Sequence, residues 1–336
     1  MNLPKSILIT IAIFSTLFFS CSSNPAETKL KQEKKDSIVK AKLLSAPIDT
    51  ADYTLRMIAL ANGDTTGLWP AKGPFPLPGA ILPYHRLVAF YGNLYSKKMG
   101  ILGELPRDEM LAKLKGEVSA WQKADTTIPV MPVLHYIAVT AQGSGDKKRM
   151  RMPFHQIDTI LNWAKEINGL VFIDVQVGWS TLQDEIPQLE KYLSMPNVHL
   201  GIDPEFSMKT GAVPGKKIGT YDAADINYVI DYLTNLVKTK NIPPKILVVH
   251  RFTQGMVTHV SERKKNPEVQ IVMDMDGWGD KILKRSTWLR YIKKEPVQFT
   301  GFKLFYKNDI KSDPNGLYHP EELMKFTPKP IYIQYQ

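Results

Sequence analysis

Cysteine is almost absent from this chain of 336 residues, which has a single one at position 21. One cysteine excludes an internal disulfide and leaves no cysteine cluster for a zinc or iron–sulfur site. Negative charge is also scarce, with 33 Asp and Glu against 43 Lys and Arg. Such an excess is typical of a solvated basic surface, or of attraction to anionic glycans or lipid head groups. Nucleic acid is not an expected partner, because no basic strand or helix carries interleaved aromatic residues.

The longest apolar run of the chain stands at its start. Residues 1–21 read MNLPKSILITIAIFSTLFFSC, in which Lys5 precedes an apolar stretch from about Ile7 to Phe19. This pattern is typical of a secretory signal. An uncleaved membrane anchor is the alternative, although the run is shorter than the roughly 20 residues that span a bilayer. Cys21, directly after the run and among serines, resembles the lipobox of bacterial lipoproteins, which implies a lipid-bearing Cys21 and a protein anchored at the cell envelope.

The rest of the chain alternates short apolar runs with amphipathic segments. The β-rich runs are Leu87–Asn93, Val130–Val139, Leu170–Val177, Val198–Phe206, Ile246–Phe252, Val269–Asp276, Thr300–Tyr306 and Pro330–Tyr335. The helix-compatible segments are Arg107–Lys123, Phe154–Ile167, Leu182–Leu193, Ala223–Lys240, Gly255–Lys265, Lys281–Lys294 and Pro320–Phe326. Strict alternation predicts a parallel sheet with right-handed crossovers. Eight strands over about 250 residues favour an α/β fold of the (β/α)₈ TIM-type barrel class over an open doubly wound sheet.

No G-x-G-x-x-G turn follows any of these runs, which argues against a dinucleotide-binding fold. We therefore divide the chain into a lipoprotein signal peptide with its lipobox cysteine (1–21), a tether and N-terminal cap (22–85), and the barrel (86–336). The stretch GLWPAKGPFPLPGAILP before the barrel has too many Pro and Gly residues for a regular element. We expect the protein to be a monomer.

Polar residues stand at the ends of the predicted strands. Alternate residues of a strand face opposite sides, so Val171, Ile173 and Val175 form an outer apolar face and leave Asp174 and Gln176 pointing inward. The same parity turns one polar set toward the barrel interior: Tyr91, Asn93, His135, Asp174, Gln176, Asp203, Glu205, His250, Asp274, Asp276, Lys303 and Gln334. Charged side chains are almost never fully buried unless paired, and barrel enzymes build their active sites at the C-terminal strand ends. The pattern predicts a functional pocket there.

Asp203 and Glu205 are the most informative members of this set. Two inward carboxylates two residues apart repel, so the pKa of one rises and it can stay protonated near neutrality. Glycoside hydrolysis needs a protonated carboxylic acid that faces an ionised carboxylate. Glu205 is the candidate acid, since it lies nearer the mouth and has the longer side chain. Asp203 is expected to hold the ionised charge, with Asp174 or Asp276 as base, nucleophile or stabiliser of the oxocarbenium ion.

The segment Ile202–Phe206 resembles barrel-fold glycoside hydrolases. Asp-x-Glu at the end of strand four is similar to fungal and phage-type lysozymes and to the end of the family 18 chitinase motif, and the closing IYIQYQ adds a looser similarity. The resemblance implies a glycan substrate or ligand. There are departures: the chitinase motif has further aspartates where this chain has Val198 and Gly201, and the lysozyme pattern has an acid where this chain has Asn93. Lys303 contradicts membership of the large clan with a Glu on strands four and seven.

Aromatic residues after the strands favour sugar binding, because sugar rings stack on flat apolar faces; the candidates are Trp179, Trp278 and Tyr306. Two other functions stay open. One is a metal-dependent hydrolase using His135, His250, Asp174, Asp274 and Asp276, although the H-x-H pattern of amidohydrolases is absent from strand one. The other is a non-catalytic glycan-binding barrel whose acids only hydrogen-bond sugar hydroxyls. We expect carboxylate chemistry without a metal or other cofactor.

Overall fold

The computed structural model describes residues 47–336. The predicted signal peptide, Cys21 and the part of the tether before residue 47 lie outside the described residues, so lipid anchoring remains a prediction. Within residues 47–336, no helix is both long enough and apolar enough to cross a membrane.

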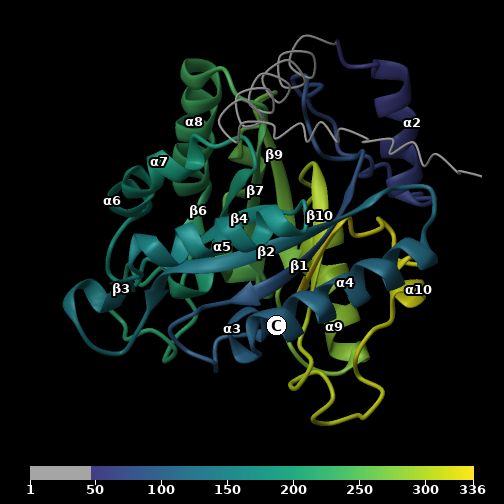
Figure 1. Cartoon of the computed structure of the whole chain (residues 1–336). Coiled ribbons are helices and arrows are strands. Elements are labelled where there is room, and N and C mark those ends of the chain that lie inside the picture. The colour runs from purple at the N-terminus through teal and green to yellow at the C-terminus, as the bar shows by residue number, and fades with distance from the viewer. Residues whose placement is uncertain (1–46) are drawn as a thin grey trace, which may run out of the picture. The chain divides into compact units, whose positions relative to one another are not determined.

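Eight parallel strands close into a barrel (Figure 1). They are β1 (Arg86–Gly92), β2 (Val130–Ala141), β4 (Leu170–Val175), β5 (Val198–Ile202), β7 (Lys245–Arg251), β9 (Val269–Met275), β10 (Phe299–Leu304) and β11 (Tyr332–Tyr335). β1 pairs in parallel with both β2 and β11, which closes the sheet. A ninth strand, β3 (Arg149–Arg151), pairs antiparallel with the end of β2. The predicted fold class is confirmed.

Helices connect most of the strands. The long ones are α4 (Arg107–Ala124), α5 (Phe154–Glu166) and α8 (Ala223–Lys240), and the short ones are α3 (Ile101–Glu104), α6 (Leu182–Glu185), α7 (Glu190–Leu193), α9 (Lys281–Thr287) and α10 (Pro320–Leu323). A π-helical segment, Trp288–Lys293, continues α9. Capping follows the sequence: Asp222 accepts a hydrogen bond from the Ala224 backbone at 3.0 Å at the start of α8.

The helix predicted at Gly255–Lys265 is wrong. The segment forms two 3₁₀ turns, Gln254–Met256 and Val260–Glu262, on either side of β8 (Val257–Thr258). β8 pairs with β6 (Tyr221–Asp222). Two β-branched residues favour the extended pairing, and the left-handed φ of 51° at His259 prevents a right-handed helix from continuing through it.

The N-terminal end of the barrel is filled and covered. Helix α2 (Thr50–Ala61) begins at Asp49, whose carboxylate accepts hydrogen bonds from the Ala51 and Asp52 backbone at 3.0 Å. Its buried side chains join one apolar cluster with the inward residues of the strands: Tyr53, Met57, Leu60, Leu87, Ala89, Val133, Phe172, Val248, Val272 and Tyr332. Their outward neighbours pack against the helices in a second cluster. Because side chains fill the N-terminal end of the barrel, the opposite end is where a substrate cavity can form.

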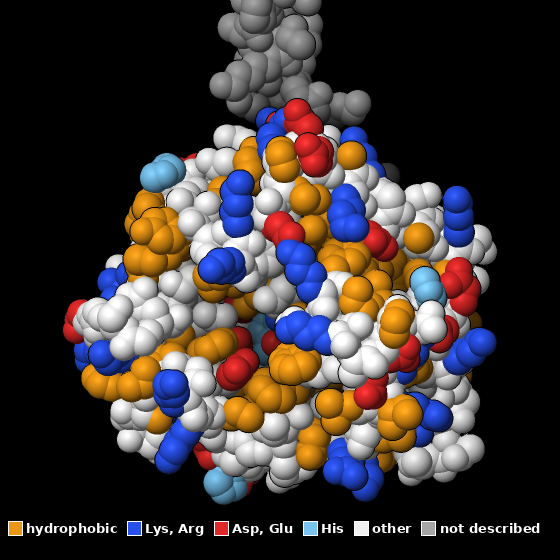
Figure 2. Space-filling view, turned by 90° about the horizontal axis from the view of Figure 1, so that it is seen from below, with side chains coloured by type: hydrophobic (Ala, Val, Ile, Leu, Met, Phe, Trp, Pro, Cys, Tyr) orange, Lys and Arg blue, Asp and Glu red, His pale blue; other side chains and the backbone are white. Residues whose placement is uncertain are grey.

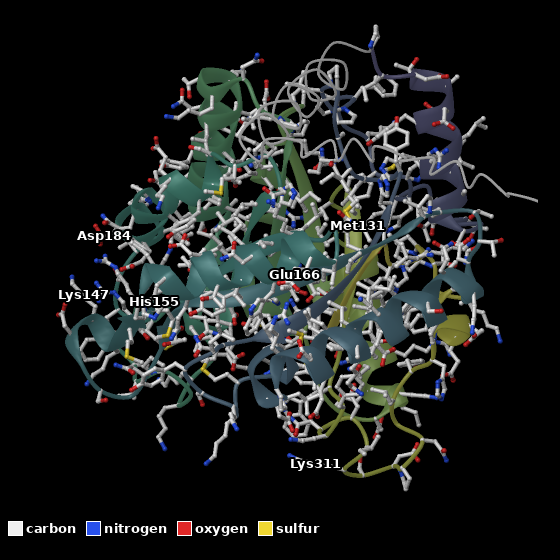
Figure 3. All side chains as sticks on the ribbon, in the orientation of Figure 1. Met131, Lys147, His155, Glu166, Asp184 and Lys311 are labelled. Atoms are coloured by element: carbon white, nitrogen blue, oxygen red, sulfur yellow. The ribbon has the colours of Figure 1, made fainter. Side chains whose placement is uncertain are left out.

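The two ends of the barrel are easily found in Figure 3. Met131 marks the start of β2, and Lys311 lies in the loop after β10 at the other end. Lys147, His155, Glu166 and Asp184 are exposed on the outside. The inward side chains nearest α2 are mostly apolar, and the cavity-lining polar residues lie toward the C-terminal strand ends.

Candidate active site

A cavity of about 720 Å³ opens among the C-terminal strand ends. Its volume lies within the range of small-molecule sites. Figure 2 shows this face hollowed at its centre, with acidic and hydrophobic side chains around the hollow and basic ones near its mouth. Part of the predicted set lines the cavity: Tyr91, Gln176, Asp203, Glu205, Asp276, Trp278 and Lys303.

A tight turn positions the two carboxylates that follow β5. The strand ends at Ile202, and Pro204–Phe206 form a 3₁₀ turn. Asp203 caps this turn, because its Oδ1 accepts a hydrogen bond from the Glu205 backbone at 3.0 Å. Asp203 is consequently buried, with 2% of its surface exposed, whereas Glu205 is only partly buried. The turn, rather than strand alternation, brings Glu205 to the cavity.

Burial raises the pKa of both carboxyl groups. Burial first, and then the negative charge of Asp276, raise the pKa of Glu205 to about 7, while the charges of Lys303 and His250 act against the rise. Burial also raises the pKa of Asp203 well above its usual value, with Glu205 and Asp276 among the charges that add to the rise. Burial thus opposes ionisation of Asp203, against the expectation that it holds the ionised charge.

Asp276 carries the ionised carboxylate instead. Lys303 Nζ lies 2.8 Å from Asp276 Oδ1, and His250 Nδ1 lies 3.1 Å from Oδ2. Burial opposes ionisation of Asp276, but these two cations outweigh it and lower its pKa. The Lys303 ammonium also lies 4.0 Å from the centre of the Tyr91 ring, which fixes it against the cavity wall.

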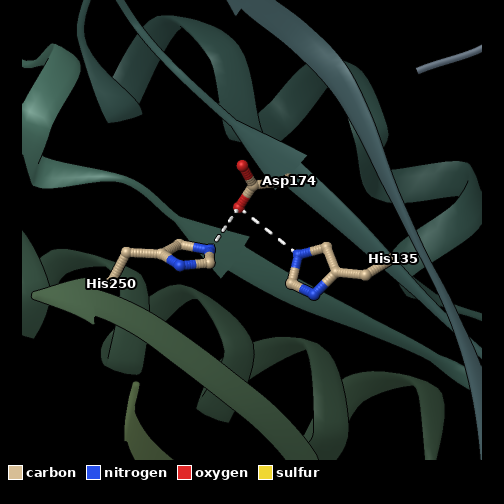
Figure 4. Close-up of side chains that lie close together, drawn as sticks. All are labelled: His135, Asp174 and His250. Carbon is tan, nitrogen blue, oxygen red and sulfur yellow. Dashed lines mark ion pairs between the residues drawn. The ribbon is translucent and has the colours of Figure 1, made fainter. Parts of the chain in front are cut away.

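Asp174 lies beneath the cavity, not in its wall. Its Oδ2 accepts a hydrogen bond from the Tyr91 hydroxyl at 2.8 Å. Its Oδ1 is 3.4 Å from His135 Nε2 and 3.3 Å from His250 Nε2 (Figure 4). None of these three side chains is exposed. Asp174 is therefore out of a substrate's reach, which corrects its prediction as base or nucleophile.

The same floor layer contains other residues predicted to bind substrate. Gln334 Nε2 lies 3.0 Å from His135 Nδ1, and Asp274 Oδ2 lies 3.4 Å from His250 Nδ1. Both side chains are fully buried, as are the two histidines. Parity places these four side chains correctly inside the barrel, but they support the cavity from below and do not line it.

Three further predicted residues do not line the cavity, because other parts of the protein hold their side chains in hydrogen bonds. Asn93 closes a turn, donating to the Ile137 carbonyl at 2.8 Å and accepting from the Tyr95 backbone at 2.7 Å. Trp179 donates to the Ala212 carbonyl at 2.7 Å. Tyr306 donates to Glu117 at 2.7 Å on the outer face. Their predicted contact with substrate stays a prediction.

The cavity also has walls that the sequence did not indicate. They include Lys98, Met99, Phe206, Arg290, Tyr291, Phe305, Asn308 and Gln336. Arg290 and Tyr291 belong to the π-helical segment after α9, and π-helical turns are frequent at functional sites. No spacing in the sequence distinguishes such a turn from an ordinary helix, so this wall could not be predicted.

No family model and no curated protein matches this chain. Among solved structures, it is similar to a GH5 family lichenase from Caldicellulosiruptor sp. F32, with a TM-score of 0.37 and 8% identity. The similarity covers 66% of this chain and 74% of the lichenase. At this TM-score the likeness supports no conclusion about activity, and the barrel assignment rests on the strand pairing. The fold and site thus define a (β/α)₈ barrel with a cavity at its C-terminal end that is lined by carboxyl groups and by basic side chains.

Proposed function

We propose that the protein is a glycoside hydrolase that acts on an envelope or environmental glycan, with Glu205 as the proton donor and Asp276 as the ionised carboxylate. One observation carries the proposal: the cavity is lined by one carboxyl group with a pKa of about 7 and by another that a lysine at 2.8 Å keeps ionised. This division between acid and carboxylate is the one that glycoside hydrolysis requires.

Each group has a defined part in the bond cleavage. Glu205 transfers its proton to the glycosidic oxygen as the bond from that oxygen to the anomeric carbon breaks. Asp276 stabilises the positive charge that develops on the sugar, and either it or a water that it deprotonates supplies the oxygen that bonds to the anomeric carbon. Lys303 orients Asp276 through the 2.8 Å contact.

The walls of the cavity suit a sugar chain. Phe206, Phe252, Trp278 and Tyr291 offer apolar ring faces. Trp278 is 57% exposed and stands where a chain could leave the cavity. Aromatic faces with a few polar groups are the usual composition of a selective small-molecule site.

The proposal is tested on the purified protein with a panel of chromogenic glycosides and polysaccharides. We expect release of a chromophore or of new reducing ends from at least one of them. Glycans that bind by calorimetry, equally to the wild type and to Glu205→Gln, with none cleaved by the wild type, would contradict the proposal and leave a glycan-binding barrel.

Lys303→Gln is expected to move the alkaline limb of the kcat/KM profile to higher pH. Of the groups that face Glu205, Asp276 on the β9 side raises its pKa, while Lys303 on β10 and His250 on β7 act against the rise. Without the Lys303 charge the pKa of Glu205 rises, so the acid stays protonated to higher pH. Lys307→Gln is the control, because Lys307 is exposed and pairs with Glu104 outside the cavity. An alkaline limb that stays in place in Lys303→Gln contradicts the assignment.

We further propose that the mature chain begins at a lipid-modified Cys21, which places the barrel at the cell envelope near its glycan. Intact-mass measurement of protein purified from membranes should give the mass of residues 21–336 plus lipid. A mature chain that begins elsewhere, or an unmodified Cys21, contradicts the anchor and leaves the barrel chemistry unaffected.

A further inference from the structure

The floor beneath the cavity brings together two histidines and an aspartate from three strands. His135 is on β2, Asp174 on β4 and His250 on β7. One ligand atom from each, Nε2 of both imidazoles and Oδ1 of the aspartate, lies within 4.8 Å of the others. We propose that these three side chains bind a divalent metal ion of the zinc class, a site separate from the acid and carboxylate of the proposed hydrolase.

Two of the three distances between the ligand atoms fit a shared ion, and the third, between the two imidazole nitrogens, is at most 4.8 Å. Asp174 Oδ1 lies 3.4 Å from His135 Nε2 and 3.3 Å from His250 Nε2 (Figure 4). Zinc binds imidazole nitrogen and carboxylate oxygen at about 2.0–2.2 Å, so two ligands at a tetrahedral angle stand about 3.4 Å apart. Direct hydrogen bonds between such groups are usually shorter, about 2.7–2.9 Å when one partner is charged.

None of the three converging atoms has a hydrogen-bond partner among the described residues, although all three are fully buried. Buried nitrogen and oxygen atoms are normally paired, and exceptions call for an explanation such as an ion. A metal would satisfy the three lone pairs at once. Two imidazoles and one carboxylate form a donor set that suits zinc better than calcium or magnesium, which prefer oxygen ligands.

The atoms of each ligand that face away from the proposed ion have neighbours that can hydrogen-bond to them, as is usual for metal ligands. With a metal bound, His250 would be neutral: its Nδ1–H, with Nδ1 3.1 Å from Asp276 Oδ2, would donate a hydrogen bond there and leave Nε2 for the ion, whose charge would replace that of the imidazolium near Asp276. Tyr91 donates to Asp174 Oδ2 at 2.8 Å. Such outer partners fix the tautomer and the orientation of metal ligands.

On the third ligand, His135 Nδ1 lies 2.5 Å from the Tyr332 hydroxyl, whose oxygen can accept a hydrogen bond from Nδ1–H. Gln334 Nε2 lies 3.0 Å from the same His135 Nδ1. The Gln334 Oε1 atom is buried and has no hydrogen-bond partner among the described residues. Gln334 Nε2 also donates to the Tyr332 hydroxyl at 2.8 Å, so the amide and the hydroxyl together hold the His135 ring from its Nδ1 side.

A glycine leaves the room that the ion needs. Gly201, on β5 between β4 and β7, faces the barrel interior, and a Cβ there would lie 2.4 Å from Asp174 Oδ1 and 2.5 Å from His135 Nε2. Any other residue would fill the volume beside two of the three ligands. The ion would tie three strands together beneath Tyr91 and Asp276, out of reach of substrate, and so act as a structural and positioning site.

Metal analysis of the purified full chain tests the site. We expect close to one zinc per chain by elemental analysis, and a melting temperature that falls on chelation and returns with Zn²⁺. Co²⁺ added to the stripped protein should give the intense visible bands of a tetrahedral site. No bound metal, no Co²⁺ bands and a melting temperature indifferent to chelator and Zn²⁺ would overturn the inference.

Matched variants locate the ion. His135→Gln is expected to lose stoichiometric metal, whereas His199→Gln is expected to keep it. His199 is also a fully buried barrel histidine, but it accepts a hydrogen bond from the Ile246 backbone at 3.1 Å and takes no part in the cluster. If His135→Gln does not fold, the Co²⁺ spectrum of the wild type decides. Glu205→Gln should keep its metal while losing turnover, so metal binding without glycan cleavage refutes only the proposed hydrolase.

Discussion

Glu205→Gln is expected to lower turnover by roughly 10²–10⁴-fold, the usual contribution of general acid catalysis, while glycan binding survives. Glutamine keeps the size and hydrogen-bonding capacity of the side chain but has no transferable proton. Since Glu205 lies on a capped turn and is only partly buried, the substitution should leave the melting temperature close to that of the wild type.

The control is Glu117→Gln. Glu117 is a carboxylate on the outer face that accepts a hydrogen bond from Tyr306 at 2.7 Å, a bond that the glutamine oxygen can also accept. Turnover, calorimetric binding and thermal melting should be measured for both variants. A normal kcat for Glu205→Gln, or a loss of turnover explained by a lower melting temperature, would remove Glu205 from the mechanism.

A chain that ends at Lys329 is expected to lose cooperative folding. β11 pairs with β1 on one side and β10 on the other, so its removal opens the barrel and exposes two sheet edges. Ile331, Tyr332, Ile333 and Tyr335 are at most 2% exposed. Burial of each such side chain contributes about 1.5–3 kcal/mol, and the sum is comparable with the roughly 5–15 kcal/mol stability of a whole domain.

Circular dichroism, thermal melting and size-exclusion chromatography compare the truncated chain with the full one. We expect a broad or absent melting transition and aggregation through the open edges. A soluble truncated chain with a single sharp transition would show that β11 is not needed to close the sheet.

The fold was predictable because its strands are buried on both faces and read as continuous apolar runs. Parity along a strand also assigned the inward residues, since the alternation of side chains is a property of the strand itself. Parity did not place three residues that follow the strands, Asn93, Trp179 and Tyr306, whose side chains belong to turns or to the outer packing. The helix prediction for Gly255–Lys265 failed because β8 in this segment pairs with β6, which is distant in sequence.

The sequence predicted which residues belong to the candidate site but not how deep in the barrel each side chain lies. Parity shows that Asp174 points inward, yet it does not show whether a side chain supports the cavity or lines it. The charge assignment has a similar limit. Asp203 and Glu205 are visible as a pair in sequence, whereas the 2.8 Å contact between Lys303 and Asp276 joins adjacent strands and appears only when the sheet closes.

The most direct test of the proposed chemistry compares the wild type and Glu205→Gln on glycosides that differ only in their leaving group. If Glu205 is the proton donor, kcat/KM of the variant should fall by roughly 10²–10⁴-fold for a sugar leaving group, which needs the proton. It should change little for an acidic phenol, which departs without one. Equal losses for both leaving groups, or no loss for either, would contradict the assignment of Glu205 as the general acid of a glycoside hydrolase.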